Sequence, residues 1–218
     1  MTSQADFFQP PSIAVWLVNL FTPTETAESI LGDLLEEFIH IASTSGIAGA
    51  RRWYWRQSLK SVAHLFGTGF RSAPWSTTAA VVVGFLLLRF VSGLPDKVLS
   101  AVTDRYLAYW SAHFKTYMFF ATDGMLIAHL LASIFVGCMV ALTAKGREMV
   151  ATMTLSLVHY ALAGVPVLAM AIVTAVRSGG VSFLWILAVQ FADSLAIVIG
   201  GAIVRTRRSA ATTRTSDA

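Results

Sequence analysis

Charged residues are scarce in this chain of 218 residues, of which 13% are charged and 56% are hydrophobic. Soluble domains usually carry about a quarter of charged residues. The deficit lies mostly after Pro74, where long apolar runs dominate, whereas the sequence before Pro74 mixes acidic and basic clusters. An ordinary soluble domain is therefore excluded for the larger, C-terminal part, and a membrane protein with a small soluble N-terminal portion is favoured.

Cysteine is almost absent as well. Cys138 is the single cysteine and lies inside an apolar run, so the chain forms no internal disulfide and has no cysteine-based metal-ligand spacing. The sequence also lacks a G-x-x-x-x-G-K-[ST] phosphate loop, an H-E-x-x-H metal motif and a G-x-S-x-G nucleophile motif. We therefore expect no enzyme activity, no catalytic residue, no metal and no cofactor.

What the sequence does contain is apolar segments long enough to cross a bilayer, which takes roughly 20 helical residues. Four segments meet this length, at about 76–94, 117–142, 149–176 and 181–204. We expect an all-α integral membrane protein with four transmembrane helices and an N-terminal cytoplasmic helical hairpin domain. The expected boundaries are a disordered N-terminus at 1–10, a helical domain at 11–70, a transmembrane domain at 75–205 and a basic disordered tail at 206–218.

Lysine and arginine predict the orientation of these spans, because cytoplasmic loops carry an excess of both residues. If the N-terminus lies in the cytoplasm, eleven of these residues fall inside and four fall outside. The opposite topology would invert this ratio. We therefore expect a multi-pass protein with both termini in the cytoplasm.

Five ionisable residues interrupt the expected spans: Arg89, Asp123, His129, His159 and Asp193. At about 1.5 Å of rise per residue, Arg89 and Asp123 lie roughly 8 and 9 Å from the outer ends of their spans, which favours a pair. The other three fall at a similar depth and predict an Asp–His cluster between the last three helices. Such residues are costly in hydrocarbon and tend to be paired or functional. Three interpretations stay open: a relay or substrate site, a structural pair that fixes helix register, and side chains without contact.

The sequence before Pro74 predicts two helices. Residues 22–43 have strong helix signals, including Thr22 as a cap and Pro23 at the first helical position, and apolar residues recur every three to four positions. Its acidic face carries Glu28, Asp33, Glu36 and Glu37. After a break at 43–49, a basic helix begins with the sequence RRWYWRQ, at 51–57.

We expect these two helices to form an acidic–basic hairpin. Its acidic face is a candidate surface for a protein partner. The basic helix carries Arg51, Arg52, Trp53, Trp55 and Arg56, which suit either a membrane interface or a partner. Because no helix-turn-helix reading element is evident, we expect no binding to nucleic acid.

The stretches at 30–38, ILGDLLEEF, and at 51–57 resemble the permease prefix domain, and the resemblance covers 11–66. That module precedes the transmembrane part of bacterial permeases related to macrolide-export and lipoprotein-release transporters. The resemblance implies a bacterial inner membrane and a cytoplasmic interaction or regulatory role, and it carries no catalytic residue. The chain departs from those permeases because only a short loop, and no large domain, separates the first two expected spans.

Two function classes follow. The first is a non-enzymatic membrane module whose helical domain binds another protein, such as a permease, an ATPase or a transcription regulator. The second is a small transporter, or a transport subunit that works with a separate ATPase and forms a homodimer. The intramembrane Asp and His residues discriminate between them, since a wet cavity favours transport and a dry, sealed bundle favours the module. The lipid bilayer is an expected partner in both cases.

Overall fold

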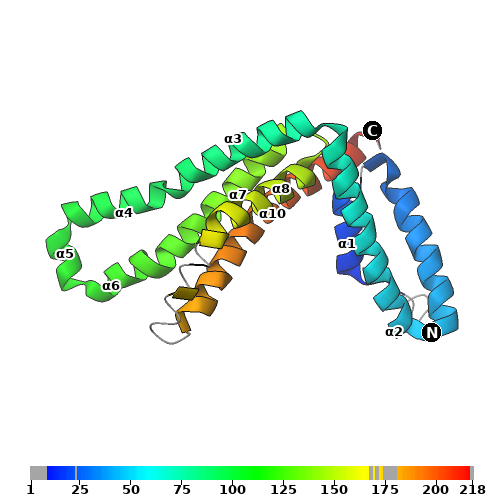
Figure 1. Ribbon diagram of the computed structural model, residues 1–218, viewed down its shortest axis with the longest axis horizontal. Coiled ribbons are helices and arrows are strands. Elements are labelled where there is room, and N and C mark those ends of the chain that lie inside the picture. The colour runs from blue at the N-terminus through cyan, green and yellow to red at the C-terminus, as the bar shows by residue number, and fades with distance from the viewer. Residues whose placement is uncertain (1–8, 23, 167–168, 170–171, 174–180, 217–218) are drawn as a thin grey trace. The chain divides into compact units, whose positions relative to one another are not determined.

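The computed structural model describes residues 9–22, 24–166, 169, 172–173 and 181–216 (Figure 1). Within these residues the chain is all-helical and contains no strand, which confirms the expected fold class at this level. The chain divides into two compact units. The first unit comprises Met1–Pro74 and Thr206–Ala218, and the second comprises Trp75–Arg205.

The first unit contains two helices, α1 (Ser12–Phe21) and α2 (Thr24–Ser72). Thr22 ends α1, and its hydroxyl donates a hydrogen bond of 2.8 Å to the carbonyl of Val18. The predicted break falls at Gly46, whose φ of 79° and ψ of 163° interrupt α2. Only glycine adopts such a backbone without strain, because it lacks a Cβ.

The parts of α2 before and after Gly46 share one core with α1. Its buried members are Ala14, Val18, Leu34, Phe38, Ala42, Ala50 and Tyr54. The rings of Phe38 and Tyr54 meet edge to face at 5.7 Å, so the chain reverses direction at Gly46. Burial raises the pKa of Tyr54 above its usual range, because the charged form loses hydration.

In the part of the chain that the structure describes, the second unit is a set of helices. In chain order they are α3 (Pro74–Ser92), α4 (Leu94–Arg105), α5 (Leu107–Ala112), α6 (Phe114–Phe119), η2 (Phe120–Gly124), α7 (Met125–Thr143), α8 (Glu148–His159), η3 (Tyr160–Gly164) and α10 (Val181–Ser216), of which the part from Thr206 on is counted with the first unit. Both η2 and η3 are single π-helical turns. The connection predicted between the first two spans is thus built of short helices.

Three helical stretches are long and apolar enough to span a membrane, which indicates a multi-pass membrane protein. They are Pro74–Arg105, Phe114–Thr143 and Leu187–Ala211. The span expected at 149–176 is described as α8 and η3 up to Gly164, and much of its remainder lies outside the described residues. Four spans therefore stay a prediction.

Both ends of the chain were expected to be disordered. Residues 1–8 lie outside the described residues. The tail at 206–218 instead continues α10 as far as Ser216. The sequence RTRRSAATTRTS contains neither glycine nor proline to end the helix, and its alanine and arginine residues favour helix.

The second unit packs around a core formed by α3, α7, α8 and α10. Two glycines let α7 and α10 approach closely, because a residue without a side chain leaves room for the neighbouring backbone. A Cβ on Gly137 would lie 2.1 Å from the carbonyl oxygen of Ile197, and one on Gly200 would lie 2.3 Å from that of Ile134. The Sγ of Cys138 donates to the carbonyl of Gly200 at 3.3 Å across the same crossing.

An ion pair that the sequence did not predict joins α8 to α10. Glu148 is 3% exposed, and its Oε2 lies 3.9 Å from the Nη1 of Arg205. The other carboxylate oxygen of Glu148 accepts a hydrogen bond of 3.0 Å from the backbone N–H of Gly146, in the turn before α8. The carboxylate is therefore compensated on both oxygens.

Candidate functional site

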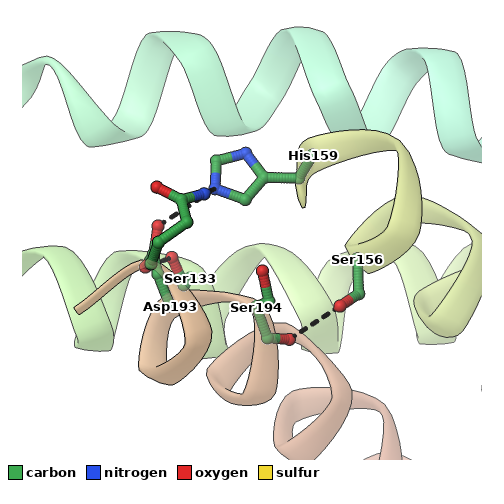
Figure 2. A network of polar contacts seen from close by, with 6 residues as sticks. Ser133, Ser156, His159, Asp193 and Ser194 are labelled. Atoms are coloured by element: carbon green, nitrogen blue, oxygen red, sulfur yellow. Dashed lines mark hydrogen bonds and ion pairs between the residues drawn. The ribbon is translucent and has the colours of Figure 1, made fainter. Parts of the chain in front are cut away.

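The centre of the second unit holds a polar network drawn from three helices (Figure 2). His159 ends α8, Asp193 lies on α10 and Ser133 lies on α7. The Nε2 of His159 lies 3.2 Å from one carboxylate oxygen of Asp193, and the hydroxyl of Ser133 donates to the other. The structure thus brings together two of the three members of the predicted Asp–His cluster and adds Ser133.

The carboxylate of Asp193 favours one position for the hydrogen on the His159 ring. A carboxylate only accepts, so Nε2 carries the hydrogen in the neutral ring and Nδ1 is left as an acceptor. The Nδ1 atom is buried and has no hydrogen-bond partner in the described part of the chain. The side-chain amide nitrogen of Gln190 lies 3.3 Å from the same Nε2, but it is a donor and cannot bond to Nε2 when Nε2 carries the hydrogen. A buried unpaired acceptor costs about 1–3 kcal/mol, so this network is only partly satisfied.

A second polar contact joins α8 to α10 beside the first (Figure 2). The hydroxyl of Ser156 donates to the backbone carbonyl of Ser194 at 2.9 Å. The serine, histidine and aspartate of the centre are not ordered as a catalytic triad, because Ser133 donates to Asp193 and not to His159. The network can therefore hold a proton and fix helix register, but it does not present an activated nucleophile.

A cleft of about 420 Å³ opens beside this network. Its lining comprises the polar residues Thr122, Asp123, His129, Gln190 and Asp193 and the apolar residues Leu126, Leu130, Trp185 and Val189. The cleft therefore lies between the segment formed by η2 and α7 and the helix α10. Three predicted residues, Asp123, His129 and Asp193, line one cavity, while His159 contacts Asp193.

His129 has a partner of its own. Its Nδ1 lies 2.8 Å from the carbonyl of Met125, which only accepts, so Nδ1 carries a hydrogen. Its Nε2 lies 3.6 Å from a carboxylate oxygen of Asp96 on α4. His129 and Asp96 form an ion pair when both ring nitrogens of His129 are protonated. The sequence did not single out Asp96, because it lies beyond the end of the first expected span.

Asp123 and Arg89 do not form the predicted pair. Among the described residues, neither side chain makes a hydrogen bond or an ion pair, and both are exposed. Asp123 lines the cleft together with residues of α10, whereas Arg89 lies on α3. The predicted depths were compatible with a contact, but depth alone does not set the direction in which a side chain leaves its helix.

Two π-helical turns mark this region. Asp123 lies within η2, and η3 begins directly after His159. Such turns are rare and occur frequently at functional sites. A sequence pattern for them was not evident, because both turns lie inside ordinary apolar runs.

The candidate residues of the first unit lie mainly on its surface. Arg51, Arg52 and Arg56 are exposed and Trp55 is 36% exposed, whereas Trp53 is half-buried and packs against the core. The acidic residues Glu28, Asp33, Glu36 and Glu37 are all exposed, and no described ion pair includes them. A groove of about 490 Å³ is lined by Gln9, Pro10, Pro11, Ser12, Ile13, Arg51 and Trp55. The sequence did not predict this groove, because the groove forms where the start of α1 meets α2.

No group of three or more His, Cys, Asp or Glu side chains in the described ranges is placed to hold a metal ion. The chemistry available in the second unit is therefore that of carboxylates, imidazoles and amides beside apolar and aromatic surface. Comparisons of the chain with known protein families, with curated proteins and with solved structures found no match. The likeness of 11–66 to the permease prefix domain accordingly stays a prediction based on its sequence motifs.

Proposed function

We propose that the chain is a non-enzymatic membrane protein that binds a small solute in the intramembrane cleft and works as a small transporter or transport subunit. The observation that carries this proposal is the position of Asp123 and Asp193, whose side chains line an open cleft between helices that are apolar enough to span a membrane. An ionisable residue at such a place is by default a functional candidate.

A purely structural role accounts for only part of the arrangement. Asp193 is satisfied by His159 and Ser133, which suits a contact that fixes the register of α7, α8 and α10. Asp123 has no such partner in the described ranges, although a buried or lipid-exposed carboxylate without compensation is costly. A ligand or a water molecule in the cleft would supply the compensation for the Asp123 carboxylate that the described residues do not supply.

The proposal has consequences for partners. Because the sequence has no phosphate loop, energy for transport would come from a separate ATPase or from an ion gradient. Four helices enclose little space, so a homodimer would provide a longer path. We further propose a bacterial inner membrane location with both termini in the cytoplasm, on the basis of the charge asymmetry and the sequence resemblance.

Thiol accessibility tests whether the cleft is wet. In a Cys138→Ser background, cysteine is introduced at Val189 in the cleft, at Ile127 on an exposed apolar surface, and at Val136 in the core. In proteoliposomes we expect a charged methanethiosulfonate reagent to modify V189C alone, because the reaction needs a hydrated thiolate. Equal protection of all three cysteines would show a dry cleft and would remove the basis of the proposal.

The second candidate function is a regulatory or accessory module that binds a partner protein through the first unit. It is favoured by the unit's own buried core together with an exposed groove that contains Ile13, which is 66% exposed, and Trp55. A photo-crosslinking residue at Ile13, compared with one at Gly32, tests this function in native membranes. We expect a specific protein adduct from position 13 alone, and adducts with lipid only would argue against the module.

A further inference from the structure

The solute of the proposed cleft can be assigned to a chemical class from the charges of its lining. Two carboxylates, Asp123 and Asp193, face the cleft. Among the described residues of the lining the one basic group is His129, which already lies against Asp96, and His159 lies against Asp193. Asp123 is left without a cation in the described part of the chain.

A carboxylate without a partner in a low-dielectric setting is stabilised either by a proton or by a bound cation. A bare metal ion fits the cleft poorly, because metal sites need several ligands and the described residues hold no group of three or more acidic, His or Cys side chains. An organic cation needs only one carboxylate for its charge and apolar surface for its body.

The rest of the lining supplies that surface. Trp185 on α10 offers an aromatic face, which attracts cations through its ring quadrupole. Leu126 and Leu130 come from α7 and complete an apolar wall. The volume of about 420 Å³ falls within the range of small-molecule sites.

From these observations we infer that the cleft binds a lipophilic organic cation of single positive charge, with Asp123 as its counter-ion and Trp185 against its apolar body. This inference rests on the proposed function and makes it more specific. It assigns to Asp193 a supporting role, because that carboxylate is already engaged by Ser133 and His159.

The test uses tetraphenylphosphonium and tetraphenylborate, two probe ions of nearly the same size and opposite charge, with the full chain in nanodiscs of zwitterionic lipid. We expect saturable binding of the phosphonium and none of the borate. We expect Asp123→Asn to weaken phosphonium binding by about tenfold or more, the effect of removing one charge-assisted contact. Asp104→Asn, which removes a carboxylate from exposed α4 outside the cleft, should leave binding unchanged.

Trp185→Leu provides a second variant that keeps every charge, and we expect it to weaken phosphonium binding while thermal unfolding of the protein is unchanged. Equal binding of both probe ions, or unaltered phosphonium binding by D123N, would overturn the inference. A cleft that is accessible to the thiol reagent but does not bind the phosphonium would reject the cation class and leave the transport proposal standing. A dry cleft would reject both.

Discussion

At the scale of single residues, two aspartates of the same cleft differ in what holds them. Asp193 contacts His159 and Ser133 on two other helices, whereas Asp123 has no partner in the described ranges. The first carboxylate therefore joins α10 to α7 and α8, whereas the second lines the cleft without such a contact. A substitution of Asp193 should therefore mainly lower stability, whereas a substitution of Asp123 should mainly weaken ligand binding.

We expect Asp193→Ala to lower the stability of the detergent-purified protein by about 1–2 kcal/mol, the upper range for polar contacts between membrane helices. The matched change Asp123→Ala should have little effect, because no contact is lost. Thermal unfolding followed by circular dichroism measures both, and a double-mutant cycle with His159→Ala isolates the pair. Equal losses for the two alanine variants would mean that Asp123 has a structural partner.

Tyr54 gives the first unit a dependence on high pH. Burial raises the pKa of Tyr54, so the folded state resists ionisation more than the unfolded state does, in which tyrosine has a pKa of about 10. This contribution is fully present below the unfolded pKa and is lost as the pH rises through the folded pKa. We expect Tyr54→Phe to unfold less readily than wild type above about pH 10, with little difference at pH 7.

The corresponding measurement is absorbance titration of tyrosinate. In the wild type, one of the five tyrosines should ionise at higher pH than expected for an exposed phenol, and this step should disappear in Tyr54→Phe. A titration that is unchanged apart from the loss of one ordinary tyrosine would contradict the prediction.

At the scale of elements, the crossing of α7 and α10 decides where the polar residues meet. The close approach at Gly137 and Gly200 sets the rotation of both helices. Ser133 lies one turn before Gly137, and Asp193 lies one turn before Ile197. The same crossing therefore brings the Ser133 hydroxyl to the Asp193 carboxylate.

Gly137→Ala should disrupt this crossing, because the new methyl group would lie 2.1 Å from a backbone carbonyl that has no freedom to rotate away. We expect a loss of about 1–3 kcal/mol in the free energy of unfolding, typical of overpacking. Gly32→Ala is the control, since nothing lies within 4 Å of its Cβ and alanine favours helix over glycine. Thermal unfolding in detergent distinguishes the two, and an unaffected G137A protein would show that the helices do not approach this closely.

At the scale of the whole molecule, the number of spans decides the topology. Three described stretches are long and apolar enough to cross, and an odd number would place the two ends of the chain on opposite faces of the membrane. The excess of Lys and Arg near both ends predicts instead that both lie in the cytoplasm, which requires the segment at 149–176 to cross as well.

Reporter fusions check this prediction. A periplasm-active phosphatase fused after residue 218 should be inactive, and a fluorescent protein that folds only in the cytoplasm should be bright at the same site. The same pair inserted between α4 and α5, in the segment expected outside, should give the reverse. An active phosphatase at both the C-terminus and the α4–α5 site would establish an odd number of crossings.

The candidate site was only partly predictable. His159, Asp193, His129 and Asp123 stood out because charge within an apolar run is visible in the sequence. Their partners were not visible, since Ser133 and Asp96 are ordinary residues until a neighbouring helix faces them. Trp53 and Trp55 likewise look alike in sequence, yet the first packs against the core and the second lines a groove.

The sequence by itself determined the helical class, the apolar spans and the break at Gly46, because these depend on local properties. In lipid a backbone must satisfy its own hydrogen bonds, so an apolar run of sufficient length becomes a helix. The tertiary structure alone decided that Asp193 meets His159 and that Arg89 and Asp123 do not meet. Sequence position gives the depth of a residue along its helix, whereas rotation about the helix axis is set by packing, here by the contact of Gly137 with Ile197.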